Sequence, residues 1–267
     1  MTWFFLGGVF ALGAIIGSFL NVVIHRYPRE ESIVFPPSRC PHCATQIKPY
    51  DNVPIFAWLW LRGRCRACRG AIDARYPLVE LANALFYVAI FQRTGLTPGF
   101  LAVAALVSMT IVLIYIDLDI QILPDVIDLP GVAIGLLIGA THLGASYPGL
   151  LLSSTLLESA AGAAAGAGIL LAIGLAYKLV RKVEGMGLGD VKMMAMLGAT
   201  LGWEPLFPLL LLASITGALV GAIVMTRTSA NMQQIALPFG VFLGIAFLVV
   251  LFYGAALMDW YVRLLLI

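Results

Sequence analysis

The chain has 267 residues, of which 61% are hydrophobic and only 11% are charged, and its formal net charge is +2. Because soluble domains carry about 25% charged residues, this composition excludes an ordinary soluble protein and indicates an integral membrane protein.

Eight apolar runs are candidates for membrane-spanning helices, which need about 20 such residues. They cover residues 2–24, 78–92, 100–116, 127–142, 151–180, 191–203, 206–226 and 237–258. The second, fourth and sixth runs are short, so their ends are the least defined. The first run is too long and too well continued to be a cleaved signal peptide. The sequence therefore predicts an all-α polytopic membrane protein with about eight transmembrane helices.

Basic residues are distributed unevenly over the loops, which predicts the orientation of the chain. If the amino terminus lies outside, all 16 Lys and Arg residues except Arg93 and Arg263 fall on the cytoplasmic side. Positive residues are retained on that side, so we expect both termini outside the cytoplasm. Asp117 and Asp190 then lie at the cytoplasmic ends of their helices.

The one long polar segment, residues 25–77, contains all four cysteines of the chain. Cys40 and Cys43 form one C-x-x-C pair, and Cys65 and Cys68 form a second pair after residues 44–64. Two such pairs are typical of a zinc ribbon, in which four thiolates close a tetrahedron around Zn²⁺. Two disulfides or free thiols are the alternatives, although a reducing cytosol opposes disulfides.

A four-thiolate site leaves no open position for water or substrate, so we expect the metal to be structural. His42 lies between the first two cysteines and could replace a ligand, but it is more simply a solvent-facing residue of the loop. The basic residues of this segment favour contact with anionic lipid over nucleic-acid binding.

Four acids lie close together after the third run, namely Asp117, Asp119, Asp125 and Asp128. Asp117 is nearest the apolar run, and Asp119 should be wetter. Asp125 follows Leu-Pro and could simply cap the next helix, whereas Asp128 could point into the same interfacial funnel. Spacing alone therefore favours Asp117 as a catalytic acid without excluding the other three.

Asp190 immediately precedes the sixth run, where the free N–H groups of a helix start stabilise an anion. The glycines before it, Gly185, Gly187 and Gly189, would allow turn geometries and close approach to an extended substrate. A plain helix cap with a glycine hinge is the alternative. We expect the side chain of Lys192 to meet lipid phosphate or a loop.

Two carboxylates at membrane depth suggest one site built from two helices, because each is costly there on its own. If the two carboxylates share one proton, they could activate a water molecule that attacks a peptide bond. Intramembrane acids also serve ion- or proton-coupled transporters, and a structural subunit that binds its partners without cutting them is a third reading. The small-residue stretch AGAAAGAG of the fifth run predicts close helix packing.

Four blocks of the sequence resemble bacterial prepilin peptidases, the GxGD-type membrane aspartic proteases of type IV pili and type II secretion systems. They are GSFLNVVIHRYP, the CPHC…DNVP…LRGRCRAC…ARYPLVE block, YIDLDIQILPDVIDLP and GMGLGDVKMMAMLGATLGW, in that order. Leu188 replaces one of the family's frequent glycines, and Val241 stands where a proline often follows P-F-G. Neither departure removes a carboxylate.

The resemblance implies a bifunctional enzyme of the bacterial inner membrane, whose termini would then be periplasmic. It would cut the basic leader of prepilins and pseudopilins just after a glycine, on the cytoplasmic side, using Asp117 and Asp190. It would then N-methylate the new amino terminus with S-adenosylmethionine. Gly187, Gly189 and Asp125 are candidate supporting residues. Polar residues of the matching blocks that border apolar runs are weak candidates for the cofactor site: Asn21, Arg75 and Glu80.

No G-x-G-x-x-G or βαβ pattern offers a nucleotide-type fold, so a cofactor site would have to form between helices and the polar loop. Glu80 could pair with a substrate amine or with Arg75. The expected organisation is a first transmembrane helix (1–24), a small cytoplasmic metal-binding segment that resembles a zinc ribbon with four cysteines (25–77), and a seven-helix peptidase domain (78–267).

Overall fold

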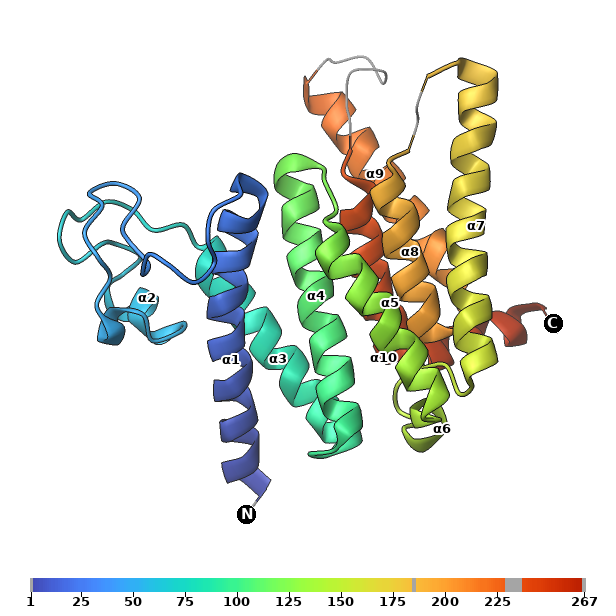
Figure 1. Ribbon diagram of the computed structural model, residues 1–267, viewed down its shortest axis with the longest axis horizontal. Coiled ribbons are helices and arrows are strands. Elements are labelled where there is room, and N and C mark those ends of the chain that lie inside the picture. The colour runs from blue at the N-terminus through green and yellow to red at the C-terminus, as the bar shows by residue number, and fades with distance from the viewer. Residues whose placement is uncertain (1, 184–185, 229–236, 266–267) are drawn as a thin grey trace. The chain divides into compact units, whose positions relative to one another are not determined.

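The computed structural model describes residues 2–183, 186–228 and 237–265, and over these residues the chain is built of helices and loops (Figure 1). Each of the eight apolar runs lies largely on one helix, so the prediction of an all-α protein is confirmed. Two short helices, α2 and α6, were not expected. The helices are α1 Thr2–Arg26, α2 Phe56–Trp60, α3 Arg75–Thr94, α4 Pro98–Ile120, α5 Asp125–Ala140, α6 Leu143–Ser146, α7 Leu156–Arg181, α8 Leu188–Leu201, α9 Leu206–Thr228 and α10 Phe239–Leu265, with 3-10 turns at Tyr27–Arg29 and Pro49–Asp51.

Five helices of the described part are long and apolar enough to cross a membrane, which makes the chain a multi-pass membrane protein. The candidate spans are Trp3–Arg29, Pro98–Ile120, Leu156–Arg181, Leu206–Arg227 and Phe239–Asp259. The remaining runs form α3, α5 and α8, of 20, 16 and 14 residues. A total of eight spans therefore stays a prediction.

The chain divides into two compact units, Met1–Val112 and Leu113–Ile267, with the division inside α4. This division follows backbone contacts and does not test the three-part organisation expected from the sequence, which stays a prediction.

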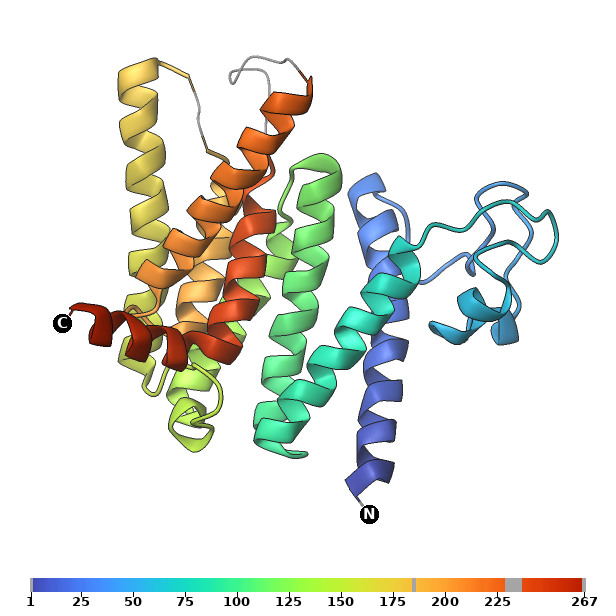
Figure 2. The same ribbon diagram turned by 180° about the vertical axis from the view of Figure 1, so that it is seen from behind.

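In the first unit, α1 and α3 pack as antiparallel neighbours (Figure 2). Glycines allow the close approach, since a Cβ added to Gly13 or Gly17 would lie 2.7 Å from the Cα of Ala84 or Glu80. The side chain of Asn83 reinforces the pair by donating to the carbonyl of Gly13 at 2.7 Å. The start of α3 therefore lies beside the polar end of α1.

In the second unit, α8 is enclosed by α5, α7 and α10. Gly162 and Gly166 of α7 face Gly198 and Met194 of α8 so closely that any side chain there would overlap the neighbouring backbone. The small-residue face predicted for this run is thus confirmed. On the other side, Gly135 of α5 lies against Ala199 of α8. These contacts fix α8 against α5 and α7, and α8 carries Asp190.

Candidate active site and metal centre

Asp117 lies in the last turn of α4 and is 4% exposed. Its Oδ2 accepts a hydrogen bond from the backbone N–H of Val241 at 3.0 Å, and the N–H of Gly240 also contributes. Both donors belong to the first turn of α10, where helix N–H groups have no partner within the helix. The start of α10 therefore holds the Asp117 carboxylate in place.

Gly240 is required at this contact for steric reasons. A Cβ at this position would lie 2.9 Å from Asp117 Oδ2 and 3.1 Å from a side-chain carbon of Leu123. A larger residue would push the carboxylate away from the N–H groups of α10. The P-F-G stretch therefore helps to hold the Asp117 carboxylate in position, although Gly240 was not among the predicted site residues.

Asp190 lies in the first turn of α8 and is half-buried. The backbone N–H of Gly187 donates to its carboxylate, and its charge interacts with that of Asp117. The two acids are 73 positions apart in the sequence, but a Cβ on Gly189, next to Asp190, or on Gly240, against the Asp117 carboxylate, would meet the same Leu123 side chain, so the end of α4 and the start of α8 lie near each other. This arrangement can share a proton and activate water between the two carboxylates.

The glycines before Asp190 differ in their roles. Gly187, the residue before α8, has φ −74° and ψ 146°, a conformation open to any residue. Gly189 is needed for close packing, because its Cβ would lie 2.9 Å from the side chain of Leu123. Gly185 lies outside the described residues. Close packing at Gly189, rather than an unusual backbone angle at Gly187, is therefore the one requirement for glycine seen at these two positions.

The other acids of the cluster occupy distinct environments. Asp119 is exposed, as expected. Asp125 is in the first turn of α5 and forms an ion pair with Lys192 of α8 at 2.6 Å. The prediction that Lys192 meets lipid phosphate or a loop is wrong, because α5 and α8 run side by side and bring its ammonium group to this carboxylate.

Asp128 is the unexpected member of the cluster. It lies one helical turn beyond Asp125 on the same face of α5 and is completely buried. Neither of its carboxylate oxygens has a hydrogen-bond partner among the described residues. Asp125, Lys192 and Asp190 are the charged groups that act on it. A buried carboxyl without a partner is rare, and only the packing of α5 on α8 reveals it.

The four cysteines lie together, with their Sγ atoms all within 4.8 Å of one another. All four are free thiols, and Cys40 and Cys68 approach to 3.8 Å. Among the described residues, they are the one group of three or more His, Cys, Asp and Glu side chains able to share an ion. The cluster fits a tetrahedral four-thiolate metal site, for which Zn²⁺ is well suited.

The two cysteine pairs are held by the same local backbone pattern. In the first loop, the N–H of Cys40 donates to the carbonyl of Thr45, and the N–H of Ala44 donates to the carbonyl of Cys40. In the second loop, the N–H of Cys65 donates to the carbonyl of Gly70, and the N–H of Arg69 donates to the carbonyl of Cys65. Ala44 and Arg69 each adopt a left-handed conformation, with φ of 56° and 60°. Each loop thereby turns its two thiols toward a common point.

The hydrogen bonds of these loops favour the thiolate form at two of the four cysteines. Hydrogen bonds with Thr45 lower the pKa of the Cys43 thiol to about 6, and backbone N–H groups lower the pKa of Cys65. At Cys68 the N–H of Gly70 acts in the same direction, but desolvation and the neighbouring thiols outweigh it and raise the pKa to about 11. Thiolates are the metal-binding form of cysteine. The ring of His42 is turned away to the carbonyl of Ala71, 3.0 Å from its Nε2, so four sulfurs rather than a histidine form the cluster.

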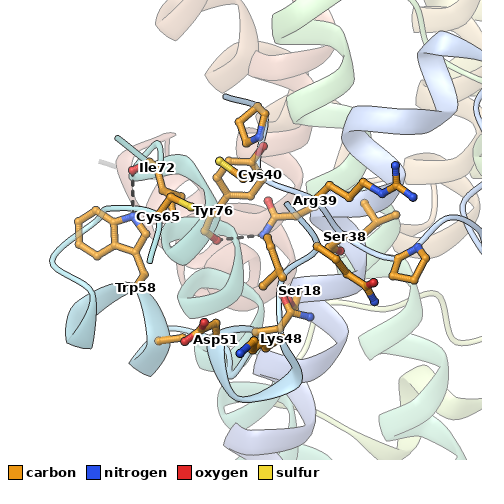
Figure 3. Close-up of a pocket in the computed structure, with 18 of the residues that line it drawn as sticks. Ser18, Ser38, Arg39, Cys40, Lys48, Asp51, Trp58, Cys65, Ile72 and Tyr76 are labelled. Carbon is orange, nitrogen blue, oxygen red and sulfur yellow. Dashed lines mark hydrogen bonds between the residues drawn. The ribbon is translucent and has the colours of Figure 1, made fainter. Parts of the chain in front are cut away.

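A cavity of about 1180 Å³ lies in the first unit between this cysteine segment and the helices α1 and α3 (Figure 3). Asn21 and Glu80 line it, whereas Arg75 is not among its lining residues. Asn21 donates to the carbonyl of Tyr76 at 3.0 Å. Glu80 accepts from the N–H of Ile55 at 2.7 Å and from the hydroxyl of Ser18. The cavity is large enough for a nucleoside-sized ligand.

Known proteins resemble the chain over nearly its whole length. Residues 11–94 match the bacterial peptidase A24 N-terminal domain, and residues 104–222 match the type IV leader peptidase family. A prepilin leader peptidase/N-methyltransferase of Aeromonas hydrophila is 38% identical over 98% of this chain and 95% of its own length. Proteins of the same name from Stutzerimonas stutzeri and Pseudomonas aeruginosa are 38% and 36% identical, each over 94% of this chain and over 92% and 91% of their own lengths. No solved structure matches the chain.

Proposed function

The chain belongs to the type IV leader peptidase family, and from that premise we propose that it removes the leader peptide of prepilins and pseudopilins with Asp117 and Asp190 as its catalytic pair. The observation that carries this proposal is the position of the two carboxylates at the end of α4 and the start of α8, both near Leu123 and with interacting charges. The relatives carry the name of a peptidase and methyltransferase, so they favour this reading over a transporter or a non-enzymatic subunit.

Peptide cleavage follows from one shared proton. We assign Asp117 as the ionised partner because two backbone N–H groups, those of Gly240 and Val241, donate to its carboxylate, whereas Asp190 accepts from the N–H of Gly187 alone. It takes a proton from water as the water oxygen attacks the scissile carbonyl carbon. Asp190, which holds the proton, donates it to the carbonyl oxygen. When the C–N bond breaks, Asp117 passes its proton to the leaving amine, and Asp190 recovers its own as the new carboxyl group forms.

The substrate and the location follow from the family and from the sequence. We place the enzyme in the bacterial inner membrane, with both termini periplasmic and the acids facing the cytoplasm. Its substrates are membrane-anchored prepilins and pseudopilins, cut after a glycine at the end of a short basic leader. Membrane lipid surrounds the helices, and nucleic acid plays no part.

The cavity of the first unit is the proposed site of amino-terminal methylation. S-adenosylmethionine would supply the methyl group on a positively charged sulfur. The Glu80 carboxylate would face that charge or accept the proton that the substrate amine releases on methylation. Asn21 would position the donor, while Arg75, which lies outside the cavity lining, would act only through the start of α3.

The proposed role of the metal is structural. Cys40, Cys43, Cys65 and Cys68 would hold Zn²⁺ and thereby fix the loops that form one wall of the cavity. Four thiolates complete its coordination, so the metal takes no part in the cleavage or in the methyl transfer.

Mass spectrometry of a processed substrate tests both activities. Purified protein in lipid is incubated with a prepilin, with and without S-adenosylmethionine. We expect loss of the leader in both samples and a further gain of one methyl group in the sample that contains the methyl donor. An intact prepilin in both samples would refute the peptidase proposal, and a cleaved but unmethylated product would refute the transferase proposal alone.

A further inference from the structure

The short helix α2 exposes an apolar face that the chain itself does not cover. Phe56, Leu59 and Trp60 are 67%, 58% and 82% exposed. Trp58 points the other way, with its indole against Gly63 and its Nε1–H donating to the carbonyl of Ile72 at 3.0 Å. The helix therefore has an anchored face and a free face, and the free face consists of large apolar side chains.

The depth of α2 is set by its first residues. The N–H of Ile55 donates to Glu80, and the Cα of Glu80 packs against Gly17 of α1. Gly17 is close to the middle of the candidate span Trp3–Arg29. At 1.5 Å per residue, it lies about 10 Å below Ile24, where the apolar run of α1 ends. The start of α2 is thus level with the apolar part of a membrane-spanning helix.

The residues that line the cavity and the two views of the ribbon also place α2 level with the apolar part of α1. Ile15 and Ser18 of α1 line the cavity together with Ala57 and Trp58 of α2. In both views of the ribbon, α2 lies beside the middle of α1 rather than beyond its end (Figures 1 and 2). Because α1 and α2 belong to one compact unit, a bilayer that surrounds α1 also reaches α2.

The segment is also chemically suited to lipid. Residues 52–61 contain no charged side chain, and the N–H groups of Ala57, Leu59 and Leu61 bond within the segment. Backbone groups satisfied in this way can enter hydrocarbon at little cost. Directly after α2, Arg62, Arg64 and Arg69 are exposed and gather around Leu61, where their long side chains can reach lipid phosphates.

We propose that α2 is a re-entrant element that inserts Phe56, Leu59 and Trp60 among the acyl chains of the leaflet next to the polar ends of α1 and α3. The basic residues after it contact the phosphate groups of the same leaflet. The cysteine segment then rests in the membrane surface rather than extending wholly into the cytoplasm. Its cavity is held at the level at which a membrane-anchored chain leaves the bilayer. This proposal does not depend on either enzymatic activity.

Two footprinting reagents test it on the unaltered protein in vesicles of phosphatidylcholine and phosphatidylglycerol. A lipid-soluble aryl diazirine labels side chains in contact with acyl chains, and hydroxyl radicals label those in contact with water. Leu219 and Ile223, exposed on the spanning helix α9, give the lipid-facing reference, and the buried Met194 and Leu197 give the background.

We expect carbene labelling of Phe56, Leu59 and Trp60 at the level of Leu219 and Ile223, several-fold above the background, with radical oxidation of Trp60 several-fold lower in vesicles than after unfolding. Carbene labelling at background together with strong oxidation would place α2 in water and overturn the proposal. Background values with both reagents would mean that a second copy or another protein covers the helix, which would overturn it as well.

Discussion

The two units of the protein place polar groups in an apolar chain by different means. In Met1–Val112 the thiols are positioned by short-range hydrogen bonds within two similar loops. In the same unit, the carboxylate of Glu80 is held by the backbone N–H of Ile55, 25 residues away in the sequence. In Leu113–Ile267 the acids are positioned by helices that approach closely at glycines. A local motif can therefore build the first site, whereas the second exists only when α4, α8 and α10 are packed.

This contrast implies that the two proposed activities can be separated by mutation. Changes at the acids should stop cleavage without altering the cysteine segment, and changes in the first unit should stop methylation while cleavage continues.

Replacement of either proposed catalytic acid should have the largest effect. Asp117→Asn or Asp190→Asn removes a proton-transfer group, whose contribution is about 10²–10⁴-fold in rate. Leader removal by purified variants, followed by gel shift and mass, measures this loss. Asp119→Asn, at an exposed position in the same turn of α4, is the control and should cleave normally. Normal cleavage by Asp117→Asn or Asp190→Asn would remove that acid from the pair.

Loss of one thiolate should empty the metal site. Cys65→Ser leaves three sulfurs, so we expect the bound metal, measured by elemental analysis, to fall from one ion per chain to nearly none. Methylation should fall with it because the cavity wall loosens, while cleavage persists. His42→Ala, in the other cysteine loop, removes a ring that is hydrogen-bonded to the carbonyl of Ala71, so this control should keep its metal. Unchanged metal content in Cys65→Ser would contradict the four-thiolate site.

Glu80→Gln tests whether the negative charge of Glu80 contributes to ligand binding in the cavity. The amide oxygen can still accept from Ile55, so the fold of the segment is retained. Loss of the negative charge should weaken S-adenosylmethionine binding about tenfold, equivalent to ~1.4 kcal/mol. Calorimetric titration measures the affinity, and Glu30→Gln, exposed near the end of α1, serves as the control. Equal affinity in wild type and Glu80→Gln would exclude a charge contact.

Asp128→Asn tests whether the buried acid acts independently of the proposed catalytic pair. Because neither oxygen of Asp128 has a partner among the described residues, the amide loses no hydrogen bond. We expect cleavage to fall by no more than about threefold, since the change alters only the charge near Asp190 and a tenfold change needs ~1.4 kcal/mol. A loss as large as that of Asp117→Asn would make Asp128 a member of the catalytic pair.

The smallest effect is expected at the ion pair of Asp125 and Lys192. Both side chains are partly exposed, at 55% and 38%, so their coupling should be about 0.2–1 kcal/mol. A double-mutant cycle of Asp125→Asn and Lys192→Gln, followed by thermal unfolding in lipid, measures it. A coupling well above that range would mean that the pair lies in a less polar environment than its exposure indicates.

The sequence predicted what depends on local spacing or on apolar length. The C-x-x-C pairs predicted the thiol cluster because each loop is closed by bonds within six residues. Contacts between helices that are far apart in the sequence could not be predicted in this way. Asp117 was preferred to its neighbours partly through resemblance, and neither the support from Gly240 nor the burial of Asp128 could be predicted. The Lys192 prediction failed because nothing local encodes the register of α5 on α8.

The most direct test of the central claim, two separable sites, uses Asp190→Asn with a pilin whose leader has already been removed. The mass of the product is recorded after incubation with S-adenosylmethionine, beside a parallel sample that contains the intact prepilin. We predict that the variant leaves the prepilin intact but adds one methyl group to the pre-cleaved pilin. Failure of both reactions in a variant that retains its metal would contradict the account.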